Sequence, residues 1–226
     1  MAVALDTLVI TPRPLSDYRN MFLLTDDELA AGPILDCPGG SSPFGAQVRA
    51  RGGTVISVDP AYTMAKDELA ARIRSDLAKL RVWVDANLDV GNWDYLGNPD
   101  ALMRWWDLAV DLFLHDYARD ERYIAAALPS LPFPDNHFTL TLSSHLLFTY
   151  PNFLSFESHV DSLLELVRVT RGEVRVYPLV DTANTVYPRL DQVRARLSER
   201  GVHTETRKAD CTYNERGDEL LACRRA

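Results

Sequence analysis

The stretch GPILDCPGGSSPFG, residues 32–45, decides the fold. A short apolar run, Ile34-Leu35, meets an acid at Asp36, and then a cysteine, a proline, two glycines and two serines follow. Glycine allows other atoms to come close to the backbone, because it has no side chain beyond a hydrogen. The pattern predicts a buried strand that ends in a glycine-rich turn.

The segment downstream completes a unit that is typical of parallel sheets. Residues 42–52 have a modest helical pattern ending in a Gly-Gly pair, and TVISVDP (54–60) predicts a second strand. Strand, glycine turn, helix and strand together form a βαβ unit. Ligands of such sheets bind beyond the carboxyl ends of the strands, where the first turn forms one wall. Asp59, 19 residues after Gly40, stands where a carboxylate can accept both hydroxyls of a ribose.

The rest of the chain alternates helical and strand patterns around a helical middle. Ser16 is expected to cap one or two short helices that end at Gly32, and Asn98 is expected to cap a long helix. Further segments with strand or helix patterns are 68–84, 99–118, 122–135, 137–144, 157–169, 172–180, 188–201, 202–210 and 218–225. The last two are expected to be antiparallel neighbours around a turn at 214–217. We expect an α/β protein of about seven strands in a single domain, residues 1–226, with a helical insertion at about 81–118 between strands 2 and 3.

Composition excludes several classes of function. The 226 residues carry a net charge of −8, which argues against a nucleic-acid surface of clustered Lys and Arg. The three cysteines form no CxxC pair, so neither a disulfide framework nor a zinc site is expected. A cytoplasmic location is expected instead. We expect no signal peptide. No apolar run is long enough to span a membrane, so we expect no membrane partner.

The turn itself narrows the class of ligand. A dinucleotide site requires GxGxxG, whereas the run here is Pro38, Gly39, Gly40, Ser41, Ser42. Neither a P-loop nor a GxSxG motif is present either. A nucleoside without phosphates therefore fits better, and two nearby acids suit a ligand with ammonium or sulfonium charge.

Taken together, the motifs resemble a known family, the class I, Rossmann-like S-adenosylmethionine-dependent methyltransferases. ILDCPGGSS is similar to their first cofactor-binding motif, VISVDP to the acidic second, and AALPSLPFPDNHFTLTLSSHLLFTY to the third and fourth. YRNMF, LDCPGG, LPFPD and SSHLLFTYP also resemble uncharacterised bacterial methyltransferase-like proteins. Pro38 and Ser42 stand where many members have the first and third glycines of the motif. The resemblance covers nearly the whole chain, and it implies a mostly parallel sheet with helices on both faces and its last strand antiparallel.

The resemblance also implies site residues, each with a simpler structural alternative. Asp36 would lie near the amino group of S-adenosylmethionine, or merely cap its strand. Asp59 would bind the ribose, or merely cap a helix. The other residues implied at the cofactor are Gly39, Gly40 and Ser41 at the turn, Pro60, Leu128 and Pro129 at the adenine, and Ser143 and Ser144 after the fourth strand. For the residues of the glycine turn, the alternative is a tight turn that binds no ligand. For Leu128 and Pro129, it is a packed apolar loop.

His145 ends the fourth strand, where the transferred methyl group would emerge. It is a candidate general base for a hydroxyl or amine, with hydrogen bonding to nearby backbone as the alternative. His137 and His159 are expected to be solvated or structural, and no metal-binding spacing is present. Tyr18, Met21 and Phe22 include candidates to fold over the cofactor, although core packing is expected for two of the three.

Six aromatic residues of the insertion are expected either to roof the active site or to pack the helix and form a dimer face: Trp93, Tyr95, Trp105, Trp106, Phe113 and Tyr117. A roof would favour a flat or apolar small-molecule acceptor. The expected activity is methyl transfer to oxygen, nitrogen or carbon of such an acceptor, with a homodimer as an option. The alternatives are a non-catalytic methyltransferase-like binding protein and, less favoured, a nicotinamide-dependent oxidoreductase.

Overall fold

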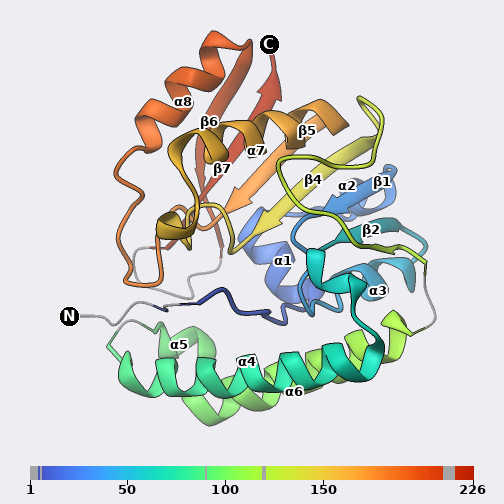
Figure 1. Ribbon diagram of the computed structural model, residues 1–226, viewed down its shortest axis with the longest axis vertical. Coiled ribbons are helices and arrows are strands. Elements are labelled where there is room, and N and C mark those ends of the chain that lie inside the picture. The colour runs from blue at the N-terminus through green and yellow to red at the C-terminus, as the bar shows by residue number, and fades with distance from the viewer. Residues whose placement is uncertain (1–4, 6, 90, 119–120, 211–216) are drawn as a thin grey trace.

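One seven-stranded sheet organises the molecule (Figure 1). The structure is a computed structural model that describes residues 5, 7–89, 91–118, 121–210 and 217–226. The strand order is β3-β2-β1-β4-β5-β7-β6. The strands are β1 (Pro33–Asp36), β2 (Thr54–Val58), β3 (Tyr123–Ile124), β4 (Phe138–Ser144), β5 (Thr170–Tyr177), β6 (Val202–Lys208) and β7 (Glu219–Arg225).

Pairing within the sheet confirms the expected Rossmann-like topology. β1 pairs in parallel with β2 and β4, β3 pairs in parallel with β2, and β5 pairs in parallel with β4. β7 runs antiparallel to both β5 and β6. The carboxyl ends of β1, β2, β3 and β4 therefore meet at one edge, where ligands of such sheets bind.

Helices cover both faces of the sheet because neighbouring strand residues point to opposite sides. Ile34 packs into the apolar cluster that contains α1 (Leu15–Phe22) and α3 (Phe44–Arg49). Leu35, the next residue, packs into the cluster on the other face with α7 (Phe156–Val169) and α8 (Leu190–Glu199).

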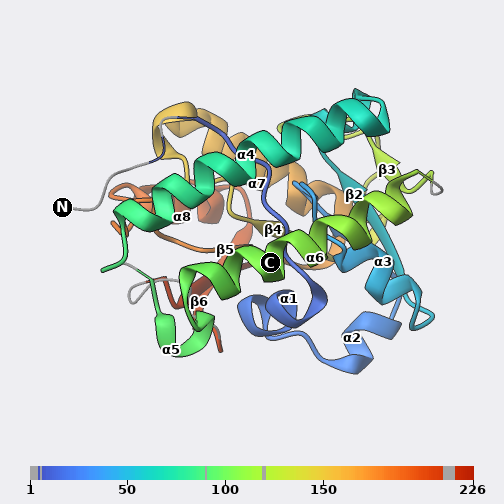
Figure 2. The same cartoon turned by 90° about the horizontal axis from the view of Figure 1, so that it is seen from below.

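A helical layer lies between β2 and β3 in the chain. It consists of η1 (Pro60–Thr63), α4 (Lys66–Ala86), α5 (Trp93–Leu96) and α6 (Pro99–Tyr117). As expected, Asn98 caps α6: its side-chain oxygen accepts a hydrogen bond from the Ala101 amide at 2.9 Å. Figures 1 and 2 show α4 and α6 side by side along one edge of the molecule, with the N-terminal segment between them and the sheet.

Two short helices precede Gly32, which is one of the two arrangements expected, but the cap of the first differs from the expectation. Pro14, rather than Ser16, is the N-cap of α1, which begins at Leu15. Thr25 caps a separate short helix, α2 (Asp26–Ala30), through a capping box with Glu28. The expected antiparallel strands at the C-terminal end are present, but most of the turn expected at 214–217 lies outside the described residues.

The described cysteines, Cys37 and Cys223, are buried and free, and Cys211 lies outside the described residues. Within the described ranges, no group of three His, Cys, Asp or Glu side chains is arranged to hold a metal ion. None of the helices found there combines the length and the apolar character that crossing a membrane requires.

Candidate functional site

A cavity of about 450 Å³ opens at the carboxyl ends of β1, β2, β3 and β4. This volume lies within the range of small-molecule and cofactor sites. We call it the main cavity. The strand ends and following turns contribute Cys37 to Gly40, Val58 to Ala61, Ala126 to Leu128, and Ser144 to Leu146.

Different neighbouring atoms leave no room for a side chain at each of the two glycines of the turn. A Cβ atom on Gly39 would lie 2.5 Å from the Tyr62 hydroxyl and 2.9 Å from the Ser57 Cβ. Gly40 has a φ of +54°, and a Cβ there would lie 3.1 Å from the backbone oxygen of Thr11. Tyr62 donates its hydroxyl to the Gly40 carbonyl at 2.9 Å. Side chains are thus excluded from the turn by the protein itself, which leaves the turn's backbone facing the main cavity.

The Thr11 oxygen belongs to a segment that closes one side of the main cavity. This segment, residues 8–13, contributes Leu8, Val9, Ile10, Thr11 and Arg13 to the cavity wall. Asp76 of α4 accepts a hydrogen bond from the Ile10 amide at 3.1 Å, and Arg72 donates to the Leu8 carbonyl at 3.3 Å. At the other end, the Ser42 hydroxyl donates to the Arg13 carbonyl. The segment therefore bridges α4 and the glycine turn.

Asp59 lies at the tip of β2 and joins the walls of the main cavity. One carboxylate oxygen accepts the Ala61 amide at 2.9 Å, which caps η1, and the other accepts the Gly40 amide at 3.1 Å. Burial raises the pKa of Asp59, while the two amide hydrogen bonds oppose this shift. A carboxylate oxygen can accept more than one hydrogen bond, so the side chain has capacity for a ligand besides its capping role.

Asp36 ends β1 but does not line the main cavity. Its carboxyl group is fully buried behind the turn, where it accepts the Tyr18 hydroxyl at 2.7 Å and contacts the Ser57 hydroxyl at 3.4 Å. Burial raises the pKa of Asp36 to about 7, although the Tyr18 and Ser57 hydrogen bonds oppose the shift. The side chain therefore supports the turn from the protein interior.

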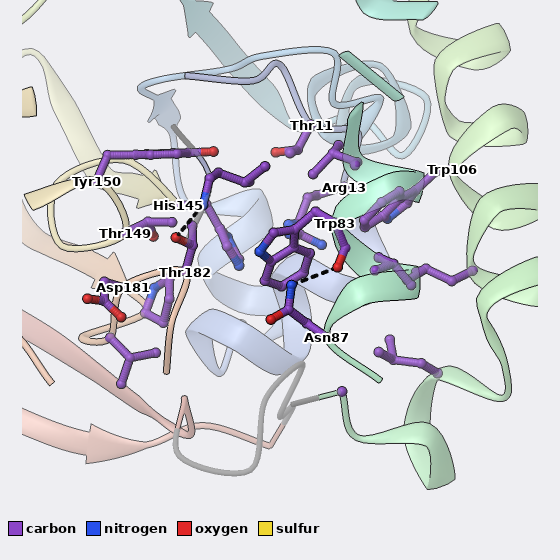
Figure 3. Close-up of a pocket in the computed structure, with 18 of the residues that line it drawn as sticks. Thr11, Arg13, Trp83, Asn87, Trp106, His145, Thr149, Tyr150, Asp181 and Thr182 are labelled. Atoms are coloured by element: carbon purple, nitrogen blue, oxygen red, sulfur yellow. Dashed lines mark hydrogen bonds between the residues drawn. The ribbon is translucent and has the colours of Figure 1, made fainter. Parts of the chain in front are cut away.

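A second, smaller cavity of about 80 Å³ adjoins the main cavity (Figure 3). We call it the small cavity. Four residues line both: Thr11, Arg13, His145 and Tyr150. Figure 3 shows His145, Thr149 and Tyr150 on one side, facing Trp83, Asn87 and Trp106 from the helical layer on the other.

His145 lies where the two cavities meet. Its backbone turns away from β4 with a φ of +50°, and its ring Nδ1 lies 2.8 Å from the Ser144 hydroxyl oxygen. Burial, with a smaller contribution from the charge of Arg13, lowers the pKa of His145 well below its ordinary value. The imidazole is therefore neutral near pH 7, as a general base requires.

Comparisons with known proteins identify the fold. No family model matches the sequence. An uncharacterized protein of Methanocaldococcus jannaschii is 28% identical over 222 residues, which cover 96% of each chain. The solved magnesium protoporphyrin IX methyltransferase from Synechocystis, with bound SAH, has a TM-score of 0.51 at 10% identity, covering 93% of this chain and 81% of its own. The chain has the class I methyltransferase fold, as the resemblance of its motifs implies.

A second solved structure with a similar fold is the 1,6-didemethyltoxoflavin-N1-methyltransferase of Burkholderia thailandensis. It holds 1,6-didemethyltoxoflavin together with S-adenosylhomocysteine. Its TM-score is 0.45 at 12% identity, over 86% of this chain and 71% of its own.

The methyltransferase fold brings most of the expected residues to the main cavity. Those on its wall are Gly39, Gly40, Asp59, Pro60, Leu128, Ser144 and His145. Those that do not line it are Asp36, Ser41, Pro129 and Ser143. Ser41 and Ser143 are fully buried beside the strand ends, so their side chains are directed into the protein.

Several wall residues have no counterpart in the sequence prediction. The N-terminal segment was expected to be only a leader, yet Thr11 and Arg13 line both cavities. Tyr18, Met21 and Phe22 are all buried in the core, and of the three Tyr18 also lines the main cavity. His159 is structural, since its two ring nitrogens contact backbone carbonyls at 2.8 Å.

The aromatic block divides between three environments. Trp93 and Trp106 line the small cavity. Phe113 and Tyr117 pack against Tyr62, with ring centroids 6.1 Å and 5.5 Å from it. Tyr95 and Trp105 are exposed at 39% and 47%. Packing therefore accounts for Phe113 and Tyr117, while the role of Trp93 and Trp106 as an active-site roof stays a prediction.

Proposed function

We propose that the protein is an S-adenosylmethionine-dependent methyltransferase that acts on a small-molecule acceptor. The observation that carries the proposal is the pair of adjoining cavities, one at the glycine turn and Asp59 and the other behind His145. A methyltransferase requires separate spaces for its cofactor and its acceptor, with the methyl group transferred where they meet. A non-catalytic binding protein would not need the second space.

The main cavity fits a nucleoside with a cationic sulfur. Asp59 would accept the ribose hydroxyls, and the backbone of Gly39 and Gly40 would face the methionine portion. The backbone of Leu128 would lie at the adenine edge. Arg13, a buried cation on the wall, would attract the carboxylate of the methionine portion.

Bound S-adenosylmethionine would supply an activated methyl group for transfer to the acceptor, with the electrons of the broken carbon–sulfur bond left on sulfur. The protein's task is to align the two reactants and exclude water, which lowers barriers by about 7–11 kcal/mol in well-oriented systems. The segment 8–13 would exclude water by closing over the main cavity. His145 would accept the acceptor's proton at Nε2 when Nδ1–H donates to Ser144.

The direct test is isothermal titration of the purified protein with S-adenosylmethionine and S-adenosylhomocysteine. We expect both to bind with one site per chain and NAD not to bind. Binding of NAD alone would replace the proposal with the oxidoreductase alternative.

Replacing Asp59 with asparagine is expected to weaken S-adenosylhomocysteine binding about 30-fold. The expected loss is about 2 kcal/mol, because hydrogen bonds to a charged group are each worth about 1.5–3 kcal/mol. The measurement is the dissociation constant by titration calorimetry. Asparagine retains one oxygen that can cap η1 but places its NH2 group opposite the Gly40 amide, so the ligand-free protein should lose about 1–2 kcal/mol of stability and the titration is made at a temperature where the variant is folded. Unchanged affinity would contradict the ribose assignment.

A further inference from the structure

The outer face of α6 carries an exposed apolar stripe. Ala101, Trp105, Leu108 and Leu112 recur at alternating spacings of four and three residues, which is the spacing at which one helix packs along another. Leu108 is 62% exposed, Leu112 51% and Trp105 47%. Single apolar residues are common on protein surfaces. A row of them in coiled-coil spacing, on a helix at an outer edge of the molecule (Figures 1 and 2), indicates instead a surface that another helix covers.

Two charged residues of opposite sign lie along one flank of this stripe. Arg104 and Asp111 are exposed, are seven residues apart and each precede a member of the stripe by one position. Neither makes an ion pair within the part of the chain that the structure describes. The other flank is formed by Leu102 and Ala109, which are buried against the rest of the protein. Charges that flank such a seam determine which helix packs there and in which direction.

The two charges are complementary to those of a second copy of α6. When two identical helices pack antiparallel, the same flank of each meets across the seam. An alignment that lays Trp105 against the partner's Leu108 brings Arg104 beside the partner's Asp111. The two-fold symmetry of such a pair repeats both contacts, so each copy supplies one arginine and one aspartate.

The same alignment fills a hollow at the start of the stripe. This hollow, of about 390 Å³, lies between α1 and α6, and Tyr95, Leu96, Ala101 and Trp105 contribute to its wall. The alignment places the partner's Leu112 against Ala101, whose small side chain leaves room for it. A large side chain that enters a gap between the side chains of the facing helix is the usual packing of such helix pairs.

Other alignments of the two helices bring like charges together or leave the charges unused. A slide of seven residues in one direction places Asp111 beside the partner's Asp111. The same slide in the other direction places Arg104 beside the partner's Arg104. Like charges across an interface disfavour it. A parallel pair would bring Arg104 to the flank of Leu102 and Ala109, which offers it no opposite charge.

We propose that the protein forms a two-fold symmetric homodimer in which α6 packs antiparallel on α6 of a second copy. Trp105 and Leu108 supply the apolar centre of the interface, and the two pairs of Arg104 with Asp111 set the alignment. A lipid surface is disfavoured, since Asp107 and Asp111 beside the stripe repel anionic headgroups.

Sedimentation equilibrium of the purified protein measures the association. We expect a dissociation constant in the micromolar range, because the stripe is smaller than a standard protein interface. Leu108→Gln keeps a good helix former but removes the apolar centre from both copies, so it should weaken the dimer about 100-fold. Asp161→Arg adds positive charge on the exposed face of α7, away from α6, and should leave the dissociation constant unchanged.

Two charge variants test the alignment itself. Arg104→Glu and Asp111→Arg each turn both attractive contacts into repulsive ones, so each variant alone should dimerise about 30-fold more weakly. Mixed in equal amounts, the two variants should form a heterodimer about as stable as the wild-type homodimer, because each then meets charges opposite to its own. The double variant should regain the homodimer for the same reason.

Three results would overturn the proposal. The first is a protein that stays monomeric up to about 1 mM. The second is a dimer that Leu108→Gln leaves intact, since the association would then use another surface. The third is failure of Arg104→Glu and Asp111→Arg to associate with each other, because the antiparallel alignment requires their charges to be complementary.

Discussion

Replacing Gly39 with alanine is expected to destabilise the folded protein by about 3 kcal/mol, at the upper end of overpacking costs. The added Cβ would lie 2.5 Å from the Tyr62 hydroxyl and 2.9 Å from the Ser57 Cβ. Tyr62 cannot turn aside, because it is buried against Phe113 and Tyr123 and its hydroxyl holds the Gly40 carbonyl. Urea unfolding measures the loss, and S-adenosylhomocysteine affinity should fall more than about tenfold because the turn shifts.

Two variants separate steric conflict from a general effect of glycine replacement. Tyr62→Phe in the Gly39→Ala background removes the closer of the two contacts, so part of the lost stability should return. Gly52→Ala introduces a Cβ with no atom within 4 Å but at a φ of +86°, so it should cost only about 1 kcal/mol. If Gly39→Ala costs no more than Gly52→Ala, the close packing of the turn is not what requires glycine.

The fold could be predicted because its signals are local. The apolar run before Asp36, the glycine turn and the strand up to Val58 specify a βαβ unit within about 30 residues, and the parallel pairing of β1 and β2 follows. The short helix-capping signal at Asn98 likewise needed no tertiary information. Ser16 was wrong as a cap because the first turn of α1 begins directly after Pro14.

Only the part of the site that lies directly at the ends of strands could be predicted from the sequence. Asp36 and Asp59 both follow strands, yet Asp59 faces the main cavity and Asp36 faces Tyr18. The direction of a side chain just beyond a strand depends on how the turn leaves the sheet, which the pattern does not encode. Arg13 was missed for a different reason. Its segment has no regular structure, and its position depends on tertiary hydrogen bonds such as that from Ile10 to Asp76.

Replacing Asp36 with asparagine is expected to stabilise the protein by about 4 kcal/mol at pH 8. Burial raises the pKa of Asp36 from its ordinary value of 3.8 to about 7, so the folded protein favours the neutral carboxyl group. Between these two pH values the folded state binds more protons than the unfolded state, and its stability falls as pH rises. Asparagine has nearly the same shape and can still accept the Tyr18 hydroxyl, but it has no charge to bury. Each pKa unit is worth about 1.4 kcal/mol, so the advantage should be only about 1.5 kcal/mol at pH 5.

Urea unfolding of both proteins at pH 5 and pH 8 measures this difference. Asp161→Asn is the matched control, because Asp161 is exposed on α7 and its replacement should change stability by less than about 0.5 kcal/mol at either pH. An Asp36→Asn variant less stable than the wild type at pH 8 would mean that the Tyr18 and Ser57 hydrogen bonds stabilise the buried carboxylate by more than its burial costs. In that case the buried charge behind the glycine turn would attract the sulfonium of a bound cofactor, and Asp36 would contribute to binding without lining the main cavity.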